Sequence, residues 1–232
     1  WQQATIVAFG STRRPESSPE QDANLRSLLA AETEVCTVVG KSSTMHVTDV
    51  LMTTPDENLR MIEESVAFLR ANGRRVIYDA EHFFDGYKAD REYALATLAA
   101  AAGAGAEALV LCDTNGGSMP WEVQSIVRAV REKIDHPIGI HAHDDAACGV
   151  ANSLAAVRAG AVHVQGTING YGERCGNANL CAVMPNLELK LGYQALPKGG
   201  IKRLREVAHF VAEIANLAPD GHMPYVGESA FA

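Results

Sequence analysis

The stretch Ile138-Gly139-Ile140-His141-Ala142-His143-Asp144-Asp145 joins a buried-strand pattern to a cluster of ionisable side chains. Its first residues are apolar, as is typical of a strand buried on both faces of a parallel sheet. Residues two apart on a strand face the same side, so the imidazoles of His141 and His143 should point in one direction. The stretch therefore predicts a buried strand whose carboxyl end carries chemistry.

Apolar runs of this kind recur along the chain at regular intervals. The six runs are Thr5–Phe9, Val35–Val39, Arg75–Tyr78, Ala108–Cys112, Ile138–His141 and Val162–Gln165. Between several of them, apolar residues recur at helical spacing, around residues 54–73, 123–130, 150–160 and 180–191. Strand and helix therefore alternate with a period of roughly 25–40 residues, which is typical of stacked βα units.

Two parallel architectures fit this alternation, an open doubly wound sheet and a closed barrel. No Gly-x-Gly-x-x-Gly follows the first run, which disfavours a dinucleotide-binding open sheet. Reactive side chains follow nearly every run, as they do on the active-site face of a TIM barrel. We therefore predict an α/β fold, a TIM (β/α)8 barrel, as a single catalytic domain over residues 1–232. With about six βα units present, we expect a truncated barrel whose first two strands are missing, and a segment 219–232 that leads into a missing lid or linker.

Composition and charge exclude several classes of protein. The 232 residues include 20 Lys+Arg and 28 Asp+Glu, a formal charge of −8, and the basic residues are scattered, which argues against a nucleic-acid partner. No apolar run approaches the roughly 20 residues that a membrane-spanning helix needs, so we expect a cytoplasmic protein without a membrane partner. The five cysteines show no Cys-x-x-Cys spacing and predict reduced thiols.

The histidine pair is the sharpest local signal for a metal site. Neutral imidazoles on one face of a strand bind ions such as Zn and Mn, whereas the alternative for His141 and His143 is a pair of polar strand-end residues hydrogen-bonded to neighbours. Asp144 and Asp145 follow directly. They would either orient an imidazole from outside the metal shell or cap the next helix.

Three other segments carry candidate chemistry, each with an alternative. Glu81 beside His82, bracketed by aromatic residues, would form an acid/base pair or lie in a solvated loop. Thr114 would donate to a substrate carboxylate or close its own turn. The glycine-rich stretch 169–179 would approach a ligand closely, or form a βα turn in which an asparagine caps the next helix.

Five motifs in the order found here resemble one enzyme family. They are YDAEHFFDG (78–86), LCDTNGG (111–117), GIHAH (139–143), GTINGYGERCGN (166–177) and YVGESAFA (225–232). Together they closely resemble the citramalate synthase branch of the 2-isopropylmalate/homocitrate synthase family, from about Ala4 to the last residue. The resemblance implies a metal-dependent TIM-barrel acyltransferase that condenses acetyl-CoA with a 2-oxo acid in branched-chain amino-acid biosynthesis. Pyruvate, giving citramalate, is the expected 2-oxo acid.

The resemblance also implies a metal site. It makes His141, His143 and Asn177 ligands of a divalent ion, Mg, Mn or Zn, that acts as a Lewis acid on the 2-oxo acid.

The family's first strand carries an Arg-Asp pair that adds a further ligand and a stabilising cation, and the 232 residues contain no counterpart. Where the family has Asn-Asp after the histidine pair, this chain has Asp144-Asp145. Without the Arg-Asp pair we expect these residues alone to be inactive. The resemblance also implies that the full-length protein is a homodimer.

The remaining implied roles concern the small-molecule substrates. The resemblance places Thr114, Tyr78 and His82 in contact with the 2-oxo acid. It places Glu81 and Glu173 in the catalytic pocket. Two other functions stay open beside the acyltransferase: a metal-dependent carbon–carbon lyase or aldolase on the same barrel, and a non-catalytic protein that binds metal or oxo acid.

Overall fold

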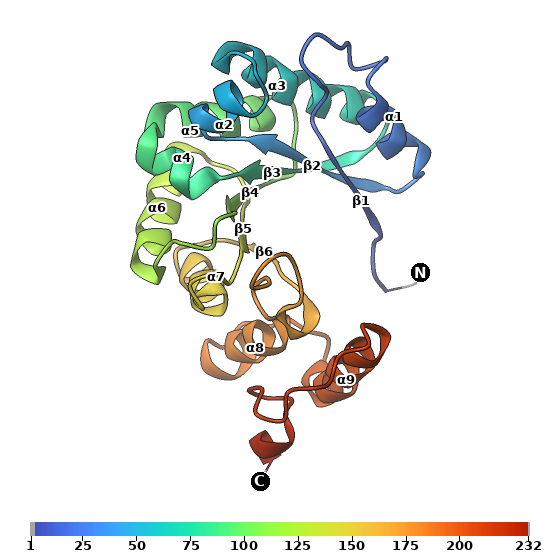
Figure 1. Ribbon diagram of the computed structural model, residues 1–232, viewed down its shortest axis with the longest axis vertical. Coiled ribbons are helices and arrows are strands. Elements are labelled where there is room, and N and C mark those ends of the chain that lie inside the picture. Colours follow the sequence, from blue (N-terminus) through green and yellow to red (C-terminus); the bar gives the residue numbers. More distant parts are fainter. Residues whose placement is uncertain (1–2, 232) are drawn as a thin grey trace.

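A parallel sheet with helices along its outer side dominates the computed structural model, which describes residues 3–231 (Figure 1). Its strands are β1 (Val7–Ser11), β2 (Val35–Lys41), β3 (Arg75–Glu81), β4 (Ala108–Asp113), β5 (Ile138–Ala142) and β6 (His163–Gln165). They lie side by side in chain order, each parallel to its neighbours. Every predicted strand is confirmed, with ends that differ by a few residues because the ladders continue into the polar segments.

Helices in the connections between strands return the chain to the amino-terminal side of the sheet, and two more helices follow β6. They are α1 (Ala23–Ala30), α2 (Thr44–Asp49), α3 (Pro55–Ala71), α4 (Phe83–Ala89), α5 (Arg91–Gly103), α6 (Pro120–Lys133), α7 (Gly149–Arg158), α8 (Leu180–Pro185) and α9 (Leu204–Ile214). Helix α3 begins as predicted, because the Thr54 hydroxyl accepts a hydrogen bond from the Glu57 N–H at 3.2 Å and Pro55 occupies the first helical position. No helix within residues 3–231 has the length and apolarity needed to cross a membrane.

One hydrogen bond shows that the sheet is strongly curved. Nε2 of Gln165 on β6 donates to Oδ1 of Asp79 on β3 at 2.9 Å, although β4 and β5 lie between these strands. Neighbouring strands are about 4.8 Å apart, so a flat sheet would separate β3 and β6 by about 14 Å. The contact requires the sheet to curl around an interior, as in a TIM barrel. Six strands of this barrel lie in the part of the chain that the structure describes.

Alternation along each strand separates the core from this interior. On β3, Tyr78 and Ala80 are fully buried in the main hydrophobic cluster, which joins the sheet to the surrounding helices. Asp79 and Glu81 point to the opposite side, because successive strand residues face opposite ways. The segment after β3 is helix α4 rather than a solvated loop, since Phe83 and Phe84 are fully buried.

Close packing of α4 against the β2–α2 connection leads to a prediction. A Cβ atom on Gly86 would overlap the carbonyl oxygen of Ser42, whereas a Cβ on Gly103, at the end of α5, would meet nothing within 4 Å. Alanine normally stabilises a helix relative to glycine by about 1 kcal/mol. We nevertheless expect Gly86→Ala to lower the free energy of unfolding by about 2 kcal/mol through overpacking, and Gly103→Ala to leave it unchanged or slightly higher. Urea unfolding of both variants checks this, and equal effects would contradict the packing.

Candidate active site

Polar side chains from several strands meet at the carboxyl end of the sheet. Asp79 and Glu81 come from β3, His141 from β5 and Gln165 from β6, and His143 follows β5 directly. His141 and Gln165 are paired in register on adjacent strands, and Nδ1 of His141 lies 2.7 Å from Oε1 of Gln165. Strand geometry therefore gathers residues that are up to 86 positions apart in sequence around one interior.

The two histidines have the spacing of neighbouring metal ligands. Nε2 of His141 lies 3.3 Å from Nε2 of His143. Two nitrogens that each lie about 2.1 Å from one ion are separated by roughly 3.0–3.4 Å at the usual coordination angles. Burial lowers the pKa of His143, and the adjacent His141 and Arg174 lower it further. A neutral imidazole can bind a metal, but Nδ1 of His143 lies 3.0 Å from the donor-only Nη2 of Arg174, so its ring proton lies on Nε2. Binding through Nε2 therefore requires Arg174 to move away so that Nδ1 takes this proton.

Asn177 provides a third side chain, beside the two histidines, that could bind a metal ion. It forms an isolated antiparallel bridge with His143, and its side-chain Oδ1 is buried without a hydrogen-bond partner. Leaving such an oxygen unpaired is costly, and coordination to a cation would satisfy it. A Cβ on Gly172 would overlap the Asn177 amide, so glycine is needed there to seat it. Within residues 3–231 no three His, Cys, Asp or Glu side chains form a metal-binding group, but His141, His143 and Asn177 together fit a divalent ion.

Arg174 ties three segments of the site together. Its Nε and Nη2 donate to the two carboxylate oxygens of Asp145 at 2.8 and 2.9 Å, and Nη2 also donates to the Thr114 carbonyl oxygen at 2.6 Å. The same Nη2 lies 3.0 Å from Nδ1 of His143. Arg174 also lowers the pKa of the exposed Asp145 carboxyl. The charge of Asp145 raises the pKa of His143 and so opposes the effect of Arg174.

The neighbouring acidic residues take other positions. Asp144 accepts a hydrogen bond at 2.7 Å from the N–H of Gly149, the first residue of α7, as in the helix-capping alternative. The side chain of Glu173 is 71% exposed and lies 3.5 Å from Nη1 of Arg174. Glu173 thus lies at the rim, outside the group around His141.

Glu81, His82 and Thr114 form a second group beside the histidine pair. Glu81 pairs with Lys41 at 2.5 Å, and its other oxygen lies 4.0 Å from Nε2 of His82. The His82 ring stacks on His46 with centroids 3.7 Å apart. The Thr114 hydroxyl oxygen accepts from the His82 N–H at 2.8 Å, so it joins two strand ends and does not close its own turn. Burial lowers the pKa of His82, and His46 lowers it further.

Tyr78 does not join the other candidates. It lies on the outer side of β3, fully buried, with no hydrogen-bond partner for its hydroxyl. Burial strongly raises its pKa. The expectation that Tyr78 contacts the 2-oxo acid therefore does not fit its position, because strand alternation turns it away from Glu81.

Residues that were not singled out in the sequence also belong to the site. Asp79 and Gln165 extend the hydrogen-bonded chain from His141, and Lys41 and His46 contact the Glu81–His82 pair. The two-residue period that selects Glu81 also selects Asp79, so alternation along β3 was a usable signal. Gln165 carried no such signal, since its role depends on the curvature of the sheet.

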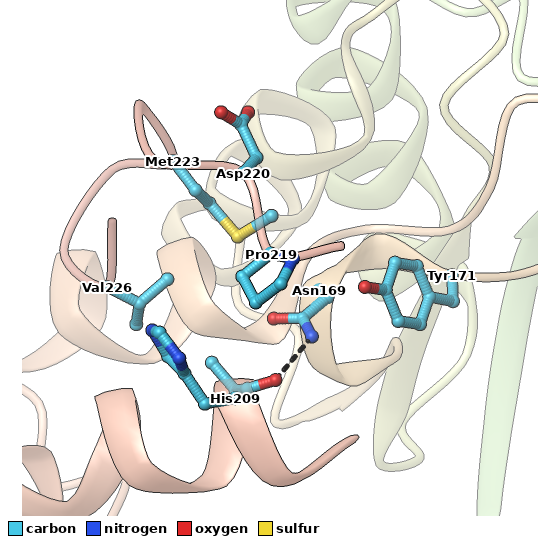
Figure 2. A pocket seen from close by; sticks show the side chains of 8 residues that line it. Asn169, Tyr171, His209, Pro219, Asp220, Met223 and Val226 are labelled. Carbon is cyan, nitrogen blue, oxygen red and sulfur yellow. Dashed lines mark hydrogen bonds between the residues drawn. The ribbon is translucent and has the colours of Figure 1, made fainter. Parts of the chain in front are cut away.

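Two pockets differ in their relation to these residues. A cavity of about 10 Å³ lies between the segment after β6 and the C-terminal region, among Asn169, Tyr171, His209 and Met223 (Figure 2). It has room for about one water molecule, and none of the candidate ligands lines it. An open cleft of about 400 Å³ at the ends of β1–β3 includes Glu81 in its lining and has the size of a small-molecule site.

The curled parallel sheet and the site at its carboxyl end define a TIM-barrel protein of the class that assembles its chemistry from strand ends. The chain belongs to the HMGL-like family, whose model matches residues 15–211. It is 54% identical over 230 residues to an (R)-citramalate synthase of Geobacter sulfurreducens and 56% identical over 230 residues to that of Aquifex aeolicus. Each alignment covers 99% of this chain, but the chain spans only 44% of the length of each relative.

The solved structures support the same fold. An HMG-CoA lyase of Bacillus subtilis superposes with a TM-score of 0.77, over 94% of this chain and 72% of that one, at 17% sequence identity. At this identity the likeness concerns the fold alone. The TIM-barrel fold and the resemblance to the 2-isopropylmalate/homocitrate synthase family are thereby confirmed.

The burial of Asp79 gives a pH-dependent prediction for stability. Desolvation raises the pKa of this carboxyl to about 6, against the opposing effects of Gln165 and His141. Between pH 4 and pH 6 the folded protein therefore holds a proton that the unfolded chain releases, so stability falls as pH rises through this window. In chelator-treated protein, Asp79→Asn should raise the free energy of unfolding by about 2 kcal/mol at pH 7.5 and hardly at pH 4.

Thermal unfolding across this pH range measures the effect. The exposed carboxylate Asp135 provides a matched control, because Asp135→Asn removes a charge without burial. A gain for Asp79→Asn that is the same at both pH values would contradict a buried charge at position 79.

Proposed function

We propose that the full-length protein is a citramalate synthase, which condenses acetyl-CoA with pyruvate. The observation that carries this proposal is the identity of more than half the residues, over nearly all of the chain, with proteins of that name. The lyases found among the solved structures share the fold at much lower identity, which favours the synthase over a carbon–carbon lyase. Acetyl-CoA and a 2-oxo acid are accordingly the proposed substrates.

His141, His143 and Asn177 are the residues proposed to hold the divalent ion. When bound, such an ion supplies a Lewis acid to the oxygens of the 2-oxo acid. The protein itself fixes the positions of these three side chains. The histidines stand at the end of one strand, and Asn177 is fixed beside His143 by backbone pairing and by the close approach of Gly172.

The neighbouring group is proposed to bind the 2-oxo acid and to move protons. The Thr114 oxygen accepts from the His82 backbone, which leaves its O–H free to donate to a substrate carboxylate. A base takes a proton from the methyl carbon of acetyl-CoA, that carbon attacks the keto carbon, and the keto oxygen gains a proton. Water then hydrolyses the thioester and releases CoA. Glu81, held by Lys41, and the neutral imidazole of His82 are the groups suited to these proton transfers.

Three further features of the full-length protein follow the resemblance and are proposed on that ground. Glu173 would approach the substrates from the rim of the site. The protein would form a homodimer and would act in the cytoplasm.

CoA release by the full-length protein, measured with a panel of 2-oxo acids, tests the function. We expect activity with pyruvate that a chelator abolishes and Mn²⁺ restores.

His143→Ala should reduce kcat/KM by about 100-fold or more, the loss of several kcal/mol of charge stabilisation, and Asn177→Ala should do so to a lesser degree. Cys175→Ser, at an exposed thiol, should change nothing. Cleavage of a 3-hydroxyacyl-CoA with no CoA release from acetyl-CoA would sink the proposal in favour of a lyase.

A further inference from the structure

A chain of side-chain hydrogen bonds connects the candidate metal site to a buried carboxylate on the other side of the barrel. Nδ1 of His141 lies 2.7 Å from Oε1 of Gln165, and Nε2 of Gln165 lies 2.9 Å from Oδ1 of Asp79. Asp79 is 4% exposed. The chain crosses the interior from β5 through β6 to β3, so it exists only because the sheet is curled.

When Asp79 is ionised, only one arrangement of hydrogen-bond donors and acceptors is possible among His141, Gln165 and Asp79. A carboxylate accepts hydrogen bonds and donates none, so the amide nitrogen of Gln165 must face Asp79. The amide oxygen of Gln165 then faces His141 and can only accept. Nδ1 of His141 must therefore carry the ring proton, and Nε2 must be unprotonated. This is the nitrogen that lies 3.3 Å from Nε2 of His143.

We infer that Asp79 is a positioning residue for the metal site, which acts through the amide of Gln165 to hold His141 in the tautomer whose Nε2 can bind a metal. The inference rests on the proposed metal-binding function of His141. A metal-ligating histidine commonly donates its other N–H to a carboxylate or carbonyl, and such partners affect metal affinity by roughly 10–100-fold. Here an amide separates the carboxylate from the ring, so the orientation of Gln165 is the element that Asp79 sets.

The first test is a direct measurement of the tautomer, which needs neither metal nor activity. Full-length protein labelled with ¹⁵N-histidine is freed of metal and measured at pH 7.5 by solid-state NMR, with the His141 signals assigned from their loss in His141→Gln. Because the Nε2–H of His143 also favours the Nδ1–H form of His141, the comparison is made in the His143→Ala background. We expect a single Nδ1–H form in His143→Ala and a mixture of tautomers in Asp79→Asn/His143→Ala, because the new amide at position 79 can either donate or accept. A single unchanged Nδ1–H form in Asp79→Asn/His143→Ala would overturn the inference.

The second test is calorimetric titration of the same proteins with Mn²⁺. Asp79→Asn should weaken binding by about 10-fold. The double variant Asp79→Asn/Gln165→Glu should restore it to within about threefold of the original. There the new carboxylate at position 165 accepts from His141, and the new amide at position 79 donates to that carboxylate. Asp135→Asn should have no effect.

The outcomes separate the inference from the function on which it rests. If Asp79→Asn weakens Mn²⁺ binding and the double variant does not restore it, Asp79 does not act through Gln165. A purely structural role of Asp79 predicts that result. If the unaltered protein binds no Mn²⁺, the proposed metal function fails, while the NMR measurement still decides whether Asp79 sets the tautomer.

Discussion

The hydrogen bond from Gln165 on β6 to Asp79 on β3 marks the constraint on which the site depends, the curl of the parallel sheet. A flat sheet would hold the strand-end residues in a row, with the first and last too far apart to cooperate. In the curled sheet, the same strand-end residues lie around a shared interior. His141 then contacts Gln165 on the adjacent strand, and Gln165 in turn contacts a carboxylate three strands away from it. Strands β2, β3, β5 and β6 each contribute one or two side chains to the site, and the surrounding packing fixes their positions.

Burial in this interior determines the charges of the polar groups. Desolvation disfavours ionised forms, so His82 and His143 are neutral and Asp79 titrates well above an ordinary aspartate. Lys41 pairs with Glu81 and Arg174 with Asp145, whereas ionised Asp79 has only the neutral amide of Gln165 as its partner. A bound cation would stabilise both the neutral ring of His143 and the unpartnered amide oxygen of Asn177.

Much of this fold could be predicted from the sequence, because a strand buried on both faces is a nearly continuous apolar run. The start of α3 was equally legible, since Thr54-Pro55 is a strong capping signal. Helix α5 was not recognised because its buried positions include alanines such as Ala94 and Ala101, which give no apolar stripe. In the site, His141 and His143 stood out by local spacing. The contact expected for Tyr78 does not fit the structure, because it depends on which face of β3 meets the helices. The role of Gln165 could not be predicted, because it depends on a contact across the barrel.

The curled sheet places His141, His143 and Asn177 where they can bind one divalent ion. Crystals of the full-length protein grown with Mn²⁺ and measured at the manganese absorption edge test this placement. We expect an anomalous peak within about 2.3 Å of Nε2 of both histidines and Oδ1 of Asn177. A manganese peak elsewhere in the barrel, or a well-ordered site with none, would contradict it.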